Sequence, residues 1–351
     1  MIIIGENLNG SIPFVARAIA GKDEDWIRAL VKKQADAGAD FIDICAYVES
    51  GETETMEWMI GLAESVTEIP ISIDSPDTEV LAKAYRQVKR PGLFNSVSME
   101  KKKRIDQIFC IMRENPGWKV IAMLCDDSGI PRSAAKRLKI FDAIMEKAAF
   151  YGITPDRIYI DPIIEAAALM DPEMEDGPGI AVNKKVIETI RRRCPAVHIT
   201  SAVSNISHSL PARRYMNYSF IVLALSYGLD SAILDPLDPG MPGIIKASEV
   251  LLGLPGAVLE QLSDAVKENC LQKSGFPKLK GFEEEEGRKA LELAMTVLAM
   301  GAGAENVKPP LKNRDLAGMV YAARALLGWE EEGCCLEYIE AYREGLFGGS
   351  V

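Results

Sequence analysis

Acidic and amide side chains stand at the ends of several short apolar runs in this chain. Carboxylate oxygens accept hydrogen bonds, and a carboxamide both donates and accepts them. Because Lys, Arg and His are scarce at these ends, the set favours a neutral ligand rich in N–H donors over a phosphorylated one. Oxygen atoms of this kind could also bind a divalent metal. The residues are Asp43, Asp74, Asn95, Asp126, Asp161 and Asn205.

The pair Ser204-Asn205 could act at a reacting atom. An uncharged Asn can hold a substrate atom whose protonation changes, because its amide offers both a donor and an acceptor. An isolated Ser-Asn pair is more typical of a turn that caps the next helix. The presence of similar residues at the other strand ends favours the functional interpretation.

The elements that must position these residues alternate along the chain. Short β-branched runs predict strands at 2–4, 41–44, 71–74, 92–95, 120–124, 158–161, 198–202 and 231–234. Amphipathic segments predict helices at 23–37, 55–66, 78–88, 101–115, 132–151, 183–193, 213–227 and 243–252. Eight such units in about 250 residues are typical of an α/β fold of the (β/α)8, or TIM, barrel type. The alternative is an open doubly wound sheet, which is disfavoured because no glycine-rich phosphate loop follows the first strand.

In a barrel the carboxyl ends of all strands meet at one mouth, where the active sites of this fold lie. A single acidic residue at a strand end is usually a helix cap or a turn former. Acidic and amide residues at most of the strand ends instead predict one polar pocket at the mouth.

The composition excludes several classes of function. The chain has 351 residues, a formal net charge of -11 and a pI near 5.0, so its surface repels nucleic acid and anionic membranes. Its apolar runs are too short to span a bilayer. The first residues enter a strand at once and carry no basic segment of a secretion signal. We therefore expect a cytoplasmic protein that binds neither nucleic acid nor membrane.

Cysteine and histidine usage predicts neither a disulfide framework nor a metal centre. The seven cysteines form no CxxC pair, and His198 and His208 are too few for a histidine-rich site. Cys45 and Cys125 lie near strand ends, where a buried small apolar residue is the more common interpretation.

The pattern changes near residue 255. Residues 1–255 are expected to form the barrel, and residues 256–351 a mostly helical C-terminal extension that ends in an amphipathic helix at 330–347. Residues 300–328 echo residues 227–253 at a shift of about 75 residues, which suggests a second copy of the last helix–strand–helix unit. That copy could form an appended lobe, or it could supply the helix that closes the barrel.

Seven short motifs resemble a known family. Together they are similar to the pterin-binding methyltransferases, and more narrowly to the methyltetrahydrofolate:corrinoid methyltransferases, over about residues 1–255. The resemblance implies a barrel that binds tetrahydrofolate in its mouth. It also implies methyl transfer between N5 of the folate and the cobalt of a corrinoid (cobalamin) carried by a partner protein. The motifs are Ile4-Gly-Glu-Asn-Leu-Asn9, Ile73-Asp-Ser75, Phe94-Asn-Ser96, Ser128-Gly-Ile-Pro131, Ile160-Asp-Pro162, Val203-Ser-Asn-Ile-Ser207 and Tyr227-Gly-Leu-Asp230.

The resemblance also implies roles for single residues. Asp74, Asn95 and Asp161 match positions that hydrogen-bond the pterin ring, and Asn205, beside Ser204, matches the Asn that reaches N5. A pterin edge presents a ring N–H beside an NH2 group, and a carboxylate can accept both. An amide at N5 would stabilise the charge that changes there during transfer. The corrinoid supplies the hard chemistry, so no protein nucleophile is needed.

Other positions match the family less closely. Asp43 and Asp126 lie where polar pocket residues are expected, although the family usually has Asn at the second, and Arg213 falls near a family arginine. Asn7 stands where Arg is common, and Ala202 where the family has Gly. An extra methyl group at Ala202 could change how closely the backbone approaches the ligand.

Two alternative functions remain open at this stage. A dihydropteroate synthase would carry Arg and Lys after the seventh-strand Ser, where this chain has Asn205-Ile206. A folate-binding protein without catalysis is the other alternative. The family resemblance also suggests a homodimer.

Overall fold

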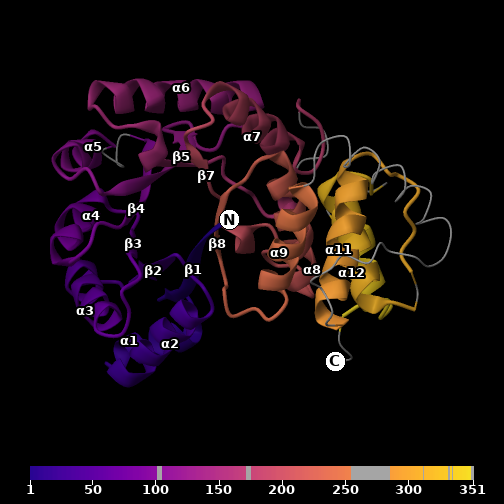
Figure 1. Ribbon diagram of the computed structural model, residues 1–351, viewed down its shortest axis with the longest axis horizontal. Coiled ribbons are helices and arrows are strands. Elements are labelled where there is room, and N and C mark those ends of the chain that lie inside the picture. The colour runs from indigo at the N-terminus through magenta and orange to yellow at the C-terminus, as the bar shows by residue number, and fades with distance from the viewer. Residues whose placement is uncertain are drawn as a thin grey trace. The chain divides into compact units, whose positions relative to one another are not determined.

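The computed structural model describes residues 1–100, 105–170, 175–253, 285–310, 312–330, 333 and 335–348. Its centre is an eight-stranded sheet in the order β7-β6-β5-β4-β3-β2-β1-β8, in which every strand pairing is parallel (Figure 1). The strands are β1 (Ile2–Asn9), β2 (Phe41–Cys45), β3 (Ile71–Asp74), β4 (Leu93–Met99), β5 (Lys119–Asp126), β6 (Ile158–Asp161), β7 (His198–Ile199) and β8 (Ser231–Leu234).

The last strand nearly closes this sheet into a barrel. β8 pairs with β1 along its whole length. On its other side, Ala202, just beyond β7, forms a parallel bridge with Ile233, whose N–H donates to the Ser201 carbonyl over 2.9 Å. The predicted (β/α)8 barrel is confirmed, and the open doubly wound sheet is wrong.

Helices follow the strands along the chain, as the sequence pattern predicts. Figure 1 shows α2 to α6 on the outside of the strands. The α-helices are α1 (Pro13–Ala20), α2 (Glu24–Asp36), α3 (Glu52–Glu64), α4 (Thr78–Ala84), α5 (Ile105–Glu114), α6 (Ala134–Phe150), α7 (Ala181–Arg193), α8 (Arg213–Tyr227), α9 (Met241–Leu252), α11 (Glu285–Gly301), α12 (Arg314–Leu326) and α13 (Leu336–Arg343). Short 3-10 turns are η1 (Tyr85–Gln87), η3 (Pro155–Arg157), η4 (Ala167–Leu169) and η5 (Val203–Asn205).

Local signals in the sequence explain several helix ends. The Asp77 carboxylate caps α4 by accepting from the Glu79 N–H over 2.8 Å. Gly228 ends α8 at φ 114°, a conformation that glycine adopts without steric cost. The sequence reasoning missed α1, a short helix that begins at Pro13, where the absent N–H costs nothing because first-turn N–H groups lack helical partners.

The chain divides into two compact units. Unit 1 comprises residues 1–163, 185–202 and 229–237 and contains all eight strands. Unit 2 comprises residues 164–184, 203–228 and 238–351 and contains α8, α9 and the C-terminal helices. The predicted boundary at residue 255, like residues 256–284 of the predicted extension, lies outside the described residues.

Apolar side chains fill the interior of the barrel in unit 1. Phe41 and Tyr159 meet edge to face with ring centroids 6.4 Å apart. Because strand side chains alternate between faces, residues two positions after a core residue also face the interior. The core side chains are Ile4, Phe41, Leu93, Ile121, Tyr159 and Ile233.

In unit 2 the C-terminal helices pack on α8. The Ser219 hydroxyl of α8 donates to the Met319 carbonyl of α12 over 3.1 Å. Phe347, which is 1% exposed, lies among four tyrosine rings with centroid distances from 4.8 to 6.0 Å. Residues 300–328, the predicted second copy, contain the last two residues of α11 and all of α12, and no strand lies between these helices in residues 302–310 and 312–313.

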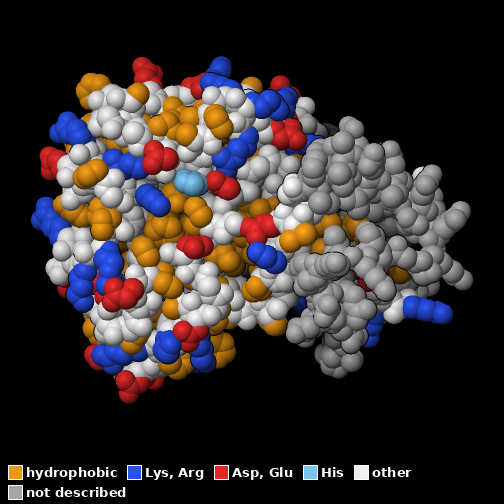
Figure 2. Space-filling view, in the orientation of Figure 1, with side chains coloured by type: hydrophobic (Ala, Val, Ile, Leu, Met, Phe, Trp, Pro, Cys, Tyr) orange, Lys and Arg blue, Asp and Glu red, His pale blue; other side chains and the backbone are white. Residues whose placement is uncertain are grey.

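The surface and the helices bear on the predicted exclusions. No helix within the described ranges is long and apolar enough to cross a bilayer. On the face seen in Figure 2, the acidic and basic side chains outside the grey region are interspersed with apolar ones.

Replacing Phe347 with Ala tests the packing of unit 2. The change removes a buried ring from a cluster of four tyrosines, so we expect the free energy of unfolding to fall by about 3–5 kcal/mol. Phe150→Ala is the matched control, because Phe150 is 82% exposed and its loss should cost less than about 0.5 kcal/mol. Urea denaturation measures both, and equal costs would contradict this packing.

Candidate functional site

Four predicted site residues belong to the interior face of the barrel strands in unit 1. Three of them follow a core residue by two positions, which places them on the same face of their strands. The fourth, Asp74, lies opposite Asn95 in the register of β3 and β4. The three pairs of core and site residue are Phe41 and Asp43, Leu93 and Asn95, and Tyr159 and Asp161.

Asp43 is the centre of a buried hydrogen-bond network across three strands. Its Oδ1 accepts from the Ser72 hydroxyl over 2.5 Å and from Asn95 Nδ2 over 3.1 Å. Asp43, Ser72 and Asn95 are all buried, so the network fixes the orientation of each side chain. The sequence reasoning missed Ser72, although it precedes Asp74 by two residues and must share its face.

Burial sets the electrostatics of this network. Desolvation, reinforced by the nearby Asp74 carboxylate, raises the pKa of Asp43 well above its ordinary value. Desolvation and the same carboxylates also raise the pKa of the Cys45 thiol. Cys45 therefore stays protonated and unreactive near neutral pH, as expected for a buried structural cysteine.

Asp161 is held by its own loop at the end of β6. Its Oδ1 accepts from the Ile163 N–H over 2.7 Å. Burial raises the pKa of Asp161 to about 6, although the Ile163 N–H and the Arg137 cation act in the opposite direction. The carboxyl is therefore mostly ionised at neutral pH and can accept hydrogen bonds from a ligand.

Arg137 fixes the two loops beside Asp161. This α6 side chain is 1% exposed. Its Nε donates to the Pro131 carbonyl over 2.8 Å, and its Nη1 donates to the carbonyls of Pro162 (2.5 Å) and Ile163 (2.8 Å). The sequence reasoning missed Arg137. The available signal was its place in an apolar stripe, the buried face of α6, which comprises Ala134, Arg137, Ile140, Phe141, Ile144 and Ala148.

Asp126 lies in a different setting from the four interior residues. It is the last residue of β5, beyond two register shifts in the pairing of β4 with β5, so the two-residue alternation does not assign its face. Its Oδ1 accepts from the hydroxyl (2.5 Å) and the N–H (2.8 Å) of Ser128, which hold the pKa of Asp126 below its ordinary value. That it contacts the pterin stays a prediction.

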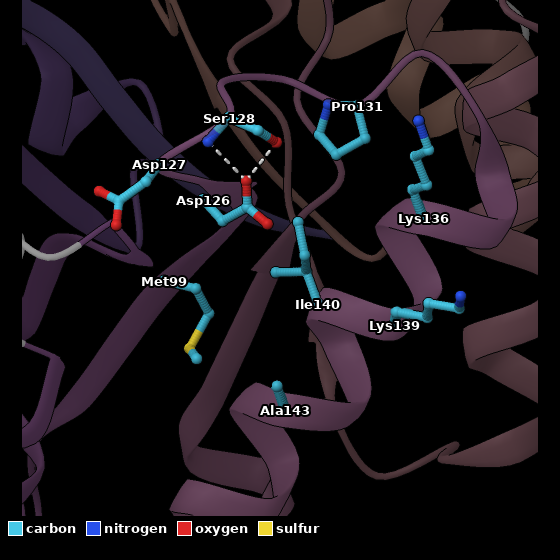
Figure 3. Close-up of a pocket in the computed structure, with 9 residues that line it drawn as sticks. All are labelled: Met99, Asp126, Asp127, Ser128, Pro131, Lys136, Lys139, Ile140 and Ala143. Carbon is cyan, nitrogen blue, oxygen red and sulfur yellow. Dashed lines mark hydrogen bonds between the residues drawn. The ribbon is translucent and has the colours of Figure 1, made fainter.

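Asp126 lines a cavity of about 540 Å³ between β4, the turn after β5 and α6. In Figure 3 the side chains of Lys136 and Lys139 point away from Asp126, while Met99 and Ile140 lie below it. The lining residues are Met99, Asp126, Asp127, Ser128, Pro131, Lys136, Lys139, Ile140 and Ala143.

The remaining predicted residues, Ser204, Asn205 and Arg213, belong to unit 2. Ser204 and Asn205 lie in η5, and the Asn205 side chain is exposed. The Arg213 guanidinium donates from Nη2 to the Ser204 carbonyl (2.6 Å) and from Nε to the Ser207 hydroxyl (3.0 Å). Because the four acceptors belong to unit 1, a pocket shared with Asn205 stays a prediction.

Asn7, one of the two departures from the family pattern, has a local explanation. Its Nδ2 donates to Asp235 Oδ1 over 2.8 Å, which joins β1 to the residue after β8. Its N–H donates to Gln34 Oε1 over 3.1 Å. Asn7 therefore serves as a neutral link between strand ends. Ala202, the other departure, forms the bridge that closes the barrel.

The four interior residues can do acceptor chemistry. Three carboxyl groups and an amide belong to the interior face of the strands, and the Asn95 amide donates to the buried Asp43. Within the part of the chain that the structure describes, no three His, Cys, Asp or Glu side chains are grouped to hold a metal ion. A ligand that presents several N–H donors fits this set.

Comparison with known proteins identifies related chains. Residues 7–235 match the pterin binding enzyme family. The chain is 42% identical over 255 residues to the methylcorrinoid:tetrahydrofolate methyltransferase of Eubacterium limosum, which is 72% of this chain and 92% of that protein. It is 29% identical over 246 residues to methionine synthase of Mycobacterium leprae, which is 67% of this chain but only 20% of that protein.

A solved structure shares the fold. Dihydropteroate synthase of Xanthomonas albilineans, solved with indole-2-carboxylic acid and 6-chloroguanine, superposes with a TM-score of 0.52 at 18% sequence identity. The superposition covers 72% of this chain and 92% of that chain. At this identity the likeness supports the barrel architecture alone.

Asp161→Asn tests the electrostatics of the site. In the folded chain the pKa of Asp161 is about 6, whereas an unfolded Asp titrates near about 3.9. The folded state binds this proton more tightly, so the contribution to stability is full below about pH 4 and is lost as pH rises through 6. We expect the free energy of unfolding of D161N, minus that of the wild type, to rise by about 2.4 kcal/mol between pH 4 and pH 8. Urea denaturation at each pH measures it, and a constant difference would contradict the shift.

Arg137→Met tests the loop anchor. The variant leaves three carbonyls without their donor, so we expect a loss of about 3 kcal/mol in the free energy of unfolding. It also removes the cation that lowers the pKa of Asp161, so the pH-dependent difference in stability between D161N and its parent should extend to higher pH in the R137M background.

Arg157→Met is the matched control for that variant. Arg157 also donates to three carbonyls, those of Trp118, Met112 and Asn115, near the start of β5. R157M should destabilise the chain without moving the titration of Asp161. A titration that R137M leaves unmoved would disprove the coupling.

Proposed function

This chain belongs to the pterin-binding enzyme family, and we propose that it transfers a methyl group between N5 of tetrahydrofolate and the cobalt of a corrinoid carried by a partner protein. The observation that carries the proposal is the 42% identity with the Eubacterium limosum methyltransferase, which extends over 92% of that protein. The acceptor-lined barrel interior supports it independently, because a pterin edge is rich in N–H donors.

In this proposal the interior residues hold the pterin. Asp74 and Asp161 accept hydrogen bonds from the ring N–H and the exocyclic NH2, which requires their ionised forms. Asn95 donates to Asp43 through Nδ2 and would offer its Oδ1 to another donor of the ring. Asp43 orients Asn95 through their hydrogen bond. Both side chains are buried, so little water competes with the ligand for them.

Asn205 is the proposed group at N5. N5 loses a proton when it receives the methyl group and gains one when it gives the methyl group away. An uncharged amide can donate to the neutral nitrogen or accept from its N–H, so it stabilises both forms without a proton of its own to lose. The corrinoid, as the second substrate, supplies a cobalt that takes or gives the methyl group. Because that chemistry is the cofactor's, the chain contributes orientation and electrostatics.

The other predicted contacts belong to the loops. Ser204 and Arg213 are hydrogen-bonded to each other, and Asp126 is hydrogen-bonded to Ser128, so each would meet folate only as part of an ordered loop.

We also infer a cytoplasmic homodimer. Light scattering of the purified chain tests the dimer.

A dihydropteroate synthase is disfavoured, because Asn205-Ile206 stands where Arg and Lys are expected. Formation of dihydropteroate from a pterin pyrophosphate and p-aminobenzoate would favour it instead.

Asn205→Ala tests the proposed function. The variant should keep the fold and its affinity for tetrahydrofolate, and it should lose turnover by about a hundredfold or more, because one preorganised polar group at the reacting atom contributes that much. Turnover is followed by the absorbance change of methylcobalamin with tetrahydrofolate.

His208→Ala is the matched control, because His208 is exposed in the same loop and only its backbone N–H binds Asn205, over 3.1 Å. It should retain turnover. Wild-type turnover in N205A would disprove the assigned role. Tight folate binding without any exchange in the wild type would instead favour a folate-binding protein.

A further inference from the structure

The C-terminal extension reaches the loop that leads from Asn205 to α8. Tyr338 of α13 is fully buried. Its hydroxyl lies 3.1 Å from the Pro211 carbonyl and 3.0 Å from the Ala212 carbonyl, so one O–H donor is shared between two consecutive acceptors. More than a hundred residues of sequence separate the donor from its acceptors, and all of these residues belong to unit 2.

The backbone that accepts the Tyr338 hydrogen bond has an unfavourable conformation at Ala212. Ala212, the residue before α8, is left-handed at φ 45° and ψ 43°. This conformation is unfavourable for a residue with a Cβ atom and persists only where the surroundings impose it. A donor fixed at the Ala212 carbonyl is such a constraint, because it fixes the direction in which the next residue leaves.

That next residue is Arg213, which reaches back to the turn of Asn205. Its guanidinium binds the Ser204 carbonyl (2.6 Å) and the Ser207 hydroxyl (3.0 Å), which flank Asn205 in the chain. The Ser207 hydroxyl also donates to the Ser204 carbonyl (3.3 Å). Hydrogen bonds, together with the peptide link from Ala212 to Arg213, therefore connect α13 to the turn that contains Asn205.

Tyr338 itself is immobilised on its other sides. Its N–H donates to Glu330 Oε1 over 3.1 Å, and its ring lies 4.8 Å from the ring of Phe347. The match to the pterin binding enzyme family ends at residue 235. Glu330, Tyr338 and Phe347 therefore lie in a part of the chain beyond the matched region.

We propose that the C-terminal extension positions the methyl-transfer site, with Tyr338 as a positioning residue that orients the Asn205 turn through Ala212 and Arg213. The proposal rests on the proposed role of Asn205. Tyr338 touches no substrate. Its hydroxyl fixes the backbone at Pro211 and Ala212, and this backbone sets the direction of Arg213. Arg213 in turn binds the Ser204 carbonyl, next to the Asn205 amide that acts at N5.

Tyr338→Phe is the central variant, because it removes one hydroxyl and keeps the buried ring. Tyr342→Phe is the matched control. Tyr342 lies one turn farther along α13, and its ring centroid is 6.0 Å from that of Phe347. The same substitution there leaves the hydrogen bonds of Tyr338 to Pro211 and Ala212 intact. With the full chain, methylcobalamin and tetrahydrofolate, we expect Y338F to lose about tenfold in kcat, because small misplacements of reacting groups have effects of this order. Y342F should retain the wild-type kcat, and both should bind tetrahydrofolate as the wild type does.

The double variant N205A/Y338F separates positioning from general damage. If Tyr338 acts through Asn205, its loss costs nothing further once the amide is gone, so the double variant should match N205A. An equal further loss in the N205A background, or a loss of folate affinity in Y338F alone, would overturn the proposal. Wild-type kcat in Y338F would overturn it too.

A readout without activity distinguishes this proposal from the proposed function. The Asn205 and Ser207 carbonyls accept from the N–H groups of His208 (3.1 Å) and Leu210 (3.0 Å). Amide hydrogen exchange in residues 203–212 should be faster in Y338F than in the wild type and Y342F. If exchange is faster but N205A keeps full turnover, Tyr338 does hold the loop, and the proposed role of Asn205 is wrong. If exchange is unchanged, Tyr338 does not hold the loop, whatever the turnover of N205A.

Discussion

The two-residue alternation of the barrel strands is the constraint on which the site depends. It places the apolar side chains of Phe41, Leu93 and Tyr159 in the barrel interior, and it then requires the residue two positions later to face the same space. Those later residues are polar, so carboxyls and an amide are held against an apolar layer. The raised pKa values of Asp43 and Asp161 follow from that burial. A ligand with fixed N–H donors compensates for the lost hydration, whereas a phosphate would add charge of the same sign.

The same alternation explains how much could be predicted from the sequence. Eight strand–helix units and their approximate bounds follow from periodicity, and the interior position of Asn95 and Asp161 follows from their offset to the preceding apolar residues. Arg137 did not follow, because a helix carries several charged residues and the sequence alone does not single out the one that is buried. Its place in the apolar stripe of α6 was the only hint. Ser72 was missed because a serine within a strand does not by itself indicate a functional side chain.

The loops were harder to predict than the strands, because their geometry depends on partners far away in the chain. Arg137 binds the carbonyls of Pro162 and Ile163, which are 25 and 26 residues away. Tyr338 binds the carbonyls of Pro211 and Ala212, which are 127 and 126 residues away. No local pattern encodes such a pairing. The resemblance to a family predicted a role for Asn205, but it could not reveal the residues beyond 235 that hold its loop.

Arg137 and Tyr338 solve one problem in the same way. A loop at a ligand site must be rigid, yet its functional side chains must remain available to the ligand. Donors that bind backbone carbonyls meet both requirements, because they fix the course of the chain without themselves occupying the carboxylate and amide side chains. They differ in charge. The Arg137 cation also lowers the pKa of Asp161, which favours the ionised acceptor, whereas the neutral Tyr338 hydroxyl adds no charge to the loop of Asn205. The charge next to Asn205 comes instead from Arg213, whose guanidinium binds the Ser204 carbonyl and the Ser207 hydroxyl.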